Sequence, residues 1–73
     1  MGEKIKSYIV TLQYDIWQKR FFFEGKDTPE SEQKFKLLCK SLTIIYEKSK
    51  DSKDFFENSQ KYFADNGFLR IAK

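Results

Sequence analysis

The sequence predicts an all-α fold, a small three-helix bundle in which residues 1–73 form a single helical domain. Two observations favour this fold. Apolar residues recur at spacings of three and four along two stretches, about 29–49 and 53–65, and turn-forming residues separate the stretches. The N-terminal stretch, about 3–24, is the third expected helix. Its pattern also fits an alternative, an α+β fold in which an N-terminal β-hairpin is followed by two helices.

Residues 3–24 are compatible with two secondary structures. The alternation of aromatic and β-branched residues from Tyr8 to Tyr14 is typical of a strand. A hairpin, however, would have to turn at Tyr14-Asp15-Ile16, where no Gly or Asn supplies a positive φ. As a helix, the stretch ends at Gly25 and has an apolar stripe, and this is the preferred interpretation. The stripe consists of Ile5, Tyr8, Ile9, Leu12, Ile16 and Phe23.

The second and third expected helices have recognisable ends. Thr28 is a good N-cap for the second helix, and Pro29 is favoured at its first position. Asp51 or Ser52 can cap the third helix. That helix is expected to end at Asn66-Gly67.

The apolar faces of the expected helices give the predicted core. The last residues of the chain are too few for a stable helix, so we expect them to cover an open end of that core. These covering residues are Phe68, Leu69 and Ile71. The predicted core consists of Ile5, Ile9, Leu12, Ile16, Phe35, Leu38, Leu42, Ile45, Tyr46, Phe55, Tyr62 and Phe63.

The composition argues against catalysis and metal binding. The chain has no histidine and one cysteine, Cys39, so it lacks the ligands of a zinc site and the pair needed for an internal disulfide. Cys39 lies on the apolar stripe of the second helix, where we expect a small buried hydrophobe. The carboxylate pairs lie at expected helix starts, where they complement the helix dipole. We therefore predict a protein that is not an enzyme, with no catalytic residue, metal or cofactor.

A second apolar stripe on the first expected helix predicts a protein–protein interface. A helix that is apolar on two faces cannot bury both against one neighbour, so the stripe is either core or contacts another molecule. The predicted interface comprises Val10, Tyr14, Trp17 and Phe21, with Lys19 and Arg20 as charges at its rim. The expected partner is another protein or a second copy of the chain, as in a homodimer. Such a protein would act as a small regulator, inhibitor or assembly factor.

Nucleic-acid binding is the alternative function. Cations and aromatic rings are interleaved from Trp17 to Phe23, which suits base stacking and phosphate neutralisation. The net charge of +3 is low for a dedicated binder, and acidic residues offset the lysines. No apolar run is long enough to span a membrane, no small-molecule substrate is expected, and the lone thiol fits the cytoplasm. The length and the Lys-, Phe- and Ile-rich composition suggest a mobile-element or phage protein.

Overall fold

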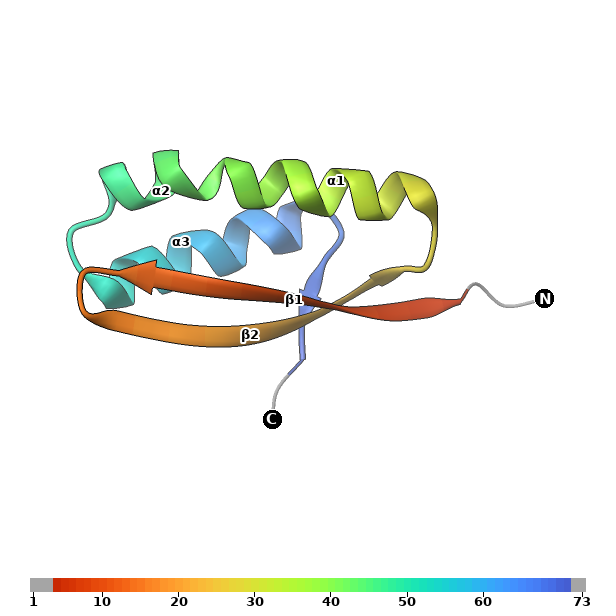
Figure 1. The fold of residues 1–73 in the computed structure, drawn as a ribbon, viewed down its shortest axis with the longest axis horizontal. Coiled ribbons are helices and arrows are strands. Elements are labelled where there is room, and N and C mark those ends of the chain that lie inside the picture. Colours follow the sequence, from red (N-terminus) through yellow and green to blue (C-terminus); the bar gives the residue numbers. More distant parts are fainter. Residues whose placement is uncertain (1–3, 72–73) are drawn as a thin grey trace.

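The computed structural model describes residues 4–71 and shows an α+β fold with two layers (Figure 1). The elements in chain order are β1 (Ile5–Tyr14), β2 (Trp17–Lys26), α1 (Pro29–Lys40), α2 (Leu42–Lys48), α3 (Ser52–Asp65) and β3 (Leu69–Arg70). Within the described residues, the strands form one antiparallel sheet in the order β1-β2-β3, and the helices cover one of its faces. The predicted all-α three-helix bundle is therefore wrong, and the alternative with an N-terminal hairpin is confirmed. Residues 1–3 and 72–73 of the predicted domain lie outside the described part.

The hairpin forms because Asp15 accepts the backbone conformation that the turn requires. Its φ is 54°, and aspartate tolerates this left-handed region better than most residues. The pairing then runs without interruption from Tyr14↔Trp17 at the turn to Ile5↔Lys26 at the far end. Asp15 thus forms the turn although neither Gly nor Asn is present. Ile16, the other turn residue, extends into solvent with 97% of its surface exposed.

The alternation along the two strands separates a buried face from an open face. Tyr8, Val10 and Leu12 point toward the helices, as do Phe21 and Phe23 on the neighbouring strand. The helical interpretation assumed that residues return to the same face every 3.6 positions instead of every two, so three predicted core residues are exposed. These exposed residues are Ile5, Ile9 and Ile16.

The core between the two layers is mainly aromatic. The ring of Phe63 on α3 lies 4.8 Å from that of Phe23 on the sheet and 5.2 Å from that of Phe35 on α1. Burying each such ring stabilises the fold by about 1.5–3 kcal/mol. Of the predicted core, Leu12, Phe35, Leu38, Phe55 and Phe63 are buried, and Leu42, Ile45 and Tyr62 pack partly buried against them. Tyr46, also predicted to be core, is exposed.

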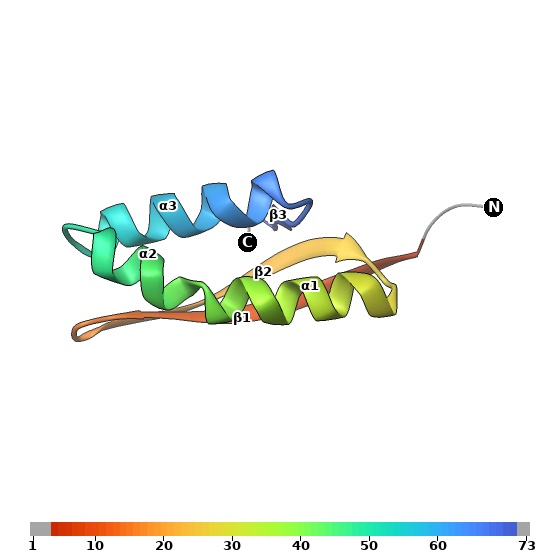
Figure 2. The same cartoon turned by 90° about the horizontal axis from the view of Figure 1, so that it is seen from above.

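The predicted helix starts are confirmed. Thr28 caps α1, since its hydroxyl oxygen accepts a hydrogen bond of 3.1 Å from the backbone N–H of Ser31. Asp51 caps α3 by accepting from the N–H of Asp54 at 2.8 Å. The helix expected over residues 29–49 is divided at Ser41, and α1 and α2 follow one another as a single arm beside α3 (Figure 2).

The chain after α3 returns to the sheet. Gly67 has a φ of 92°, which reverses the chain and lets Phe68 enter the core. β3 then pairs with β2, and the N–H of Ile71 donates to the carbonyl of Phe22 at 2.8 Å. The expectation that these residues cover the core therefore holds for Phe68, whereas Leu69 is exposed on the open face. Ile71 is half-buried but does not belong to the core cluster. In the described residues, no helix is both long enough and apolar enough to traverse a bilayer.

Candidate functional site

The outer edge of β1 is the most distinctive surface of the molecule. The sheet order places β1 at the edge, with β2 along its other side. The N–H of Asp27 donates to the carbonyl of Lys4 at 2.9 Å, which fixes the alternation of the ladder. Even-numbered residues of β1 bond to β2, so the backbone groups of the odd-numbered residues point outward. The outward-pointing residues are Ile5, Ser7, Ile9, Thr11 and Gln13.

This edge lacks the features by which proteins usually prevent strand addition. Charged side chains, prolines, bulges and short length all protect edge strands. β1 is ten residues long, contains no proline, and has an unbroken register with β2. Lys6 is its single charged residue and lies near one end. The remainder of the edge, from Ser7 to the turn, thus offers a template for another strand.

A groove lies beside the half of this edge that is nearest the turn, next to the arm formed by α1 and α2. Its volume is about 470 Å³. The hairpin contributes Thr11, Gln13 and Asp15, and the helices contribute Cys39, Leu42, Thr43 and Tyr46. An extended segment added to β1 would therefore find a helix on one side of it, with apolar and polar groups for its side chains. This arrangement suits the addition of a strand at a sheet edge.

Cys39 contributes apolar surface to this groove. Its side chain is half-buried, and desolvation by burial raises the pKa of the thiol. A raised pKa keeps the sulfur protonated at neutral pH, and the thiol is a poor nucleophile. The groove therefore suits binding better than covalent chemistry.

The open face of the sheet adds apolar surface next to the edge. Ile9 has 55% of its surface exposed and lies directly opposite the half-buried Phe22. Ile5 and Leu69 are exposed on the same face. Apolar side chains gathered in this way on one face are typical of contact surfaces.

The structure divides the predicted interface residues among different surroundings. Val10 and Phe21 are paired on the inner face and buried, so they stabilise the core and cannot contact a partner in this conformation. Lys19 and Arg20 are both exposed, but they alternate along β2 and lie on opposite faces of the sheet. The predicted set therefore does not form one surface, and it lies on a hairpin rather than on a helix.

Tyr14 and Trp17, the other two predicted residues, close the turn end of the hairpin. The Tyr14 hydroxyl donates to the backbone carbonyl of Ser49 at 3.0 Å, and both rings pack against Phe55 of α3. Desolvation raises the pKa of the Tyr14 phenol, and the nearby Tyr46 adds to the rise. The phenol therefore remains a hydrogen-bond donor at neutral pH and ties the hairpin to the helices.

Comparisons of this chain with protein-family models, with curated proteins and with solved structures found no match. The function of the protein therefore has to be inferred from its own surfaces.

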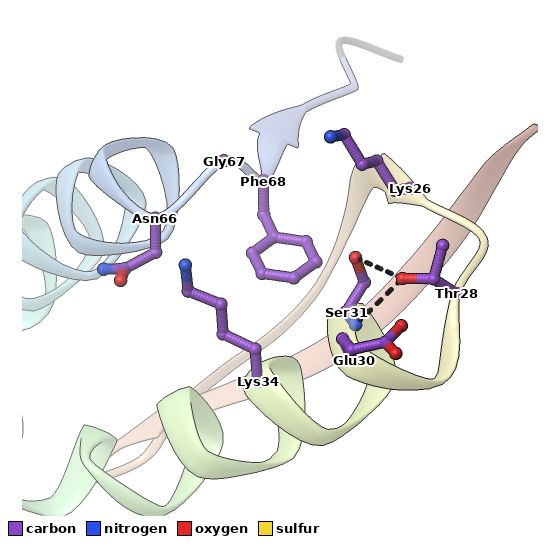
Figure 3. Close-up of a pocket in the computed structure, with 8 residues that line it drawn as sticks. All are labelled: Lys26, Thr28, Glu30, Ser31, Lys34, Asn66, Gly67 and Phe68. Atoms are coloured by element: carbon purple, nitrogen blue, oxygen red, sulfur yellow. Dashed lines mark hydrogen bonds between the residues drawn. The ribbon is translucent and has the colours of Figure 1, made fainter. Parts of the chain in front are cut away.

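Another pocket, beside the start of α1, has a volume of about 560 Å³ (Figure 3). Its hydroxyl groups, on Thr28 and Ser31, are engaged in capping the helix. The charged groups around it are of both signs, Lys26 and Lys34 with Glu30. Such a mixed lining provides no convergent set of donors for an anion. In residues 4–71, no group of three or more potential ligands is placed to hold a metal ion.

Sequence reasoning missed the edge of β1. The signal was the alternation from Tyr8 to Tyr14, which the hairpin interpretation would have used to place Ile9 and Thr11 on the opposite face from Val10. The helical interpretation instead placed Ile9 in the core.

Proposed function

We propose that this protein is a non-enzymatic interaction protein that docks on other polypeptides through the outer edge of β1. The observation that carries the proposal is a ten-residue edge strand without protective features, flanked by a groove and by exposed apolar side chains. Main-chain hydrogen bonds along such an edge provide affinity, and side-chain contacts in the groove provide selectivity. The protein would act as a small regulator, inhibitor or assembly factor. We place it in the cytoplasm, where the lone thiol would stay reduced.

Protein binding is favoured over nucleic-acid binding by the chemistry of the same surface. Base stacking needs aromatic rings on an accessible face together with cations that neutralise phosphates. The open face of β2 offers one half-buried ring, that of Phe22. Its cations, Arg20 and Lys26, are accompanied by Glu24, which lies between them on the same strand face and opposes binding of phosphate. The edge itself is nearly uncharged beyond Lys6, which suits a polypeptide strand.

A matched pair of variants tests the proposal. Ile9 and Ile44 each have 55% of their surface exposed, but Ile9 lies at the edge and Ile44 lies on α2. Ile9→Lys introduces a charge into the proposed site, whereas Ile44→Lys makes the same change away from it. Wild type and both variants, each tagged at the C-terminus, are used as baits in a nuclease-treated extract that also contains the untagged chain.

We expect a polypeptide that the wild type and Ile44→Lys retain and that Ile9→Lys loses. Equal retention by all three baits, or retention of no specific polypeptide, would contradict the proposal. A mobility assay with mixed-sequence DNA and RNA provides the second arm. Retardation at low salt that disappears as salt rises would assign the protein to the nucleic-acid class instead.

A further inference from the structure

We infer that the strand which adds to this edge is β1 of a second copy, paired antiparallel across a two-fold axis at Ile9. The inference rests on the proposed function and names its partner. The result is a continuous six-stranded sheet with the helices of both copies on one face.

The ladder itself selects the register. Outward-pointing backbone groups belong to odd-numbered residues, so an odd residue must face an odd residue of the partner strand. Pairing Ile9 with its own copy satisfies this condition. It also places Ile5 opposite Gln13 and Ser7 opposite Thr11, so every outward residue of β1 finds a partner. A two-fold axis at Ile9 thus uses the whole edge, and antiparallel pairing is the arrangement that such symmetry permits.

The charges of the strand support a second copy as the occupant. Both lysines, Lys4 and Lys6, lie at the start of the stretch, and Asp15 follows its other end. Antiparallel pairing separates the lysines of the two copies and brings them toward the partner's aspartate. A parallel pairing would place like charges side by side, which is destabilising.

The groove beside β1 provides the matching surface. Opposite residues of paired strands point to the same face, so Lys6 of one copy lies opposite Leu12 of the other, on the helix side. The groove on that side is lined by Leu42, Tyr46 and Asp15 among others. A lysine stem can pack along Leu42 and Tyr46 while its ammonium group approaches the Asp15 carboxylate.

The open face gains apolar contacts from the same pairing. Ile9 of each copy faces Ile9 of the other, next to Phe22 on the adjoining strand. Side chains that are exposed in one copy therefore form an apolar cluster at the centre of the joined sheet. Burial of this cluster and the main-chain hydrogen bonds of the joined strands would both stabilise the dimer at the two-fold axis.

Absolute mass in solution, measured by light scattering over a concentration series, is the primary test. We expect wild type and Ile44→Lys to reach twice the mass of the chain. Ile9→Lys places like charges directly opposite each other and removes the apolar contact between the two copies of residue 9. We expect its dissociation constant to rise on the order of 100-fold. Circular dichroism checks that the variant remains folded, as the exposure of Ile9 predicts.

A charge exchange tests the position of the axis. Ile9→Lys and Ile9→Glu are each expected to be monomeric, and their mixture is expected to form a heterodimer because residue 9 of one copy faces residue 9 of the other. A mixture that stays monomeric would overturn this register. A wild type that is monomeric at all concentrations, or an Ile9→Lys variant that dimerises as well as wild type, would overturn self-pairing.

Cross-linking measures the register directly, in a Cys39→Ser background with diamide as oxidant. A hydrogen-bonded pair places its Cα atoms about 5.5 Å apart, within the range of a disulfide. Ile9→Cys is therefore expected to form a covalent dimer. Thr11→Cys is the control, because the two copies of residue 11 would lie about 13 Å apart at about 3.3 Å per residue. Equal cross-linking of both variants would overturn the axis at Ile9.

The outcomes also separate this inference from the proposed function. A monomeric chain whose wild type and Ile44→Lys baits retain a different polypeptide, lost from the Ile9→Lys bait, would refute the second copy as partner and preserve the edge as the site. Loss of both behaviours would refute both statements.

Discussion

The close approach of Gly25 to Phe68 leads to a sharp prediction about stability. A Cβ added at Gly25 would lie 2.6 Å from the Cδ1 and Cε1 atoms of Phe68 and 3.3 Å from Cε2 of Tyr8. Phe68 is buried, so its ring cannot swing into solvent. Gly25→Ala therefore forces the ring or the strand to shift.

The expected loss combines two effects of opposite sign. Overpacking a core by one methyl group costs about 1–3 kcal/mol. Replacing a strand glycine with alanine returns about 0.5–1 kcal/mol through the entropy of the unfolded chain. We therefore expect Gly25→Ala to lower the free energy of unfolding by about 0–2.5 kcal/mol, with a midpoint of about 1 kcal/mol, measured by urea denaturation monitored by circular dichroism.

A double-mutant cycle identifies the cause. Phe68→Leu removes ring atoms near the new methyl group, so Gly25→Ala should cost at least about 1 kcal/mol less in that background. Phe63→Leu, elsewhere in the same core, is the control background and should leave the cost nearly unchanged. Equal costs of Gly25→Ala in all three backgrounds would refute the steric account.

Two further substitutions test other parts of the fold. Ser59 is fully buried, and its hydroxyl has no hydrogen-bond partner within the described chain, so Ser59→Ala is expected to leave stability unchanged or raise it by about 1 kcal/mol in urea denaturation; a loss above this size would show that the hydroxyl is satisfied. Asp15 has a positive φ in the two-residue turn, so Asp15→Gly is expected to raise the free energy of unfolding by about 0.5–1 kcal/mol, measured as a higher thermal midpoint. A lower midpoint would mean that the aspartate side chain stabilises the turn.

The sequence predicted the C-terminal half of the fold well because its signals are local. Thr28 and Asp51 define helix starts through hydrogen bonds to residues three positions away, and Pro29 occupies the first position of α1; all three features appear in the structure. The break at Ser41 was not predicted, since α1 and α2 share one apolar period.

The N-terminal half depends on contacts that the sequence does not display. Residues 5–24 have apolar side chains at both helical and strand spacings, and pairing between β1 and β2 decides between them. The requirement for Gly or Asn at the turn was too strict, because Asp15 also accepts a positive φ. This error moved Ile9 from the open face to the core and replaced a sheet edge by an aromatic helix face.

The predicted interface was affected by the same error. Its aromatic members, Tyr14, Trp17 and Phe21, pack against the helices of the same chain. These residues form a second apolar stripe on a helix, but on the hairpin they lie on the inner face. The surface that we propose for protein binding is therefore the edge of β1 and not this aromatic stripe.

Amide hydrogen exchange along β1 tests the central claim most directly, because it reports which backbone groups lack a partner. At low concentration, we expect the amides of the even residues from Lys6 to Tyr14 to be protected and those of Ser7, Ile9 and Thr11 to exchange rapidly. At high concentration, or with a bound partner, the odd amides should become protected. Odd amides that exchange at the same rapid rate under all these conditions would contradict docking at this edge.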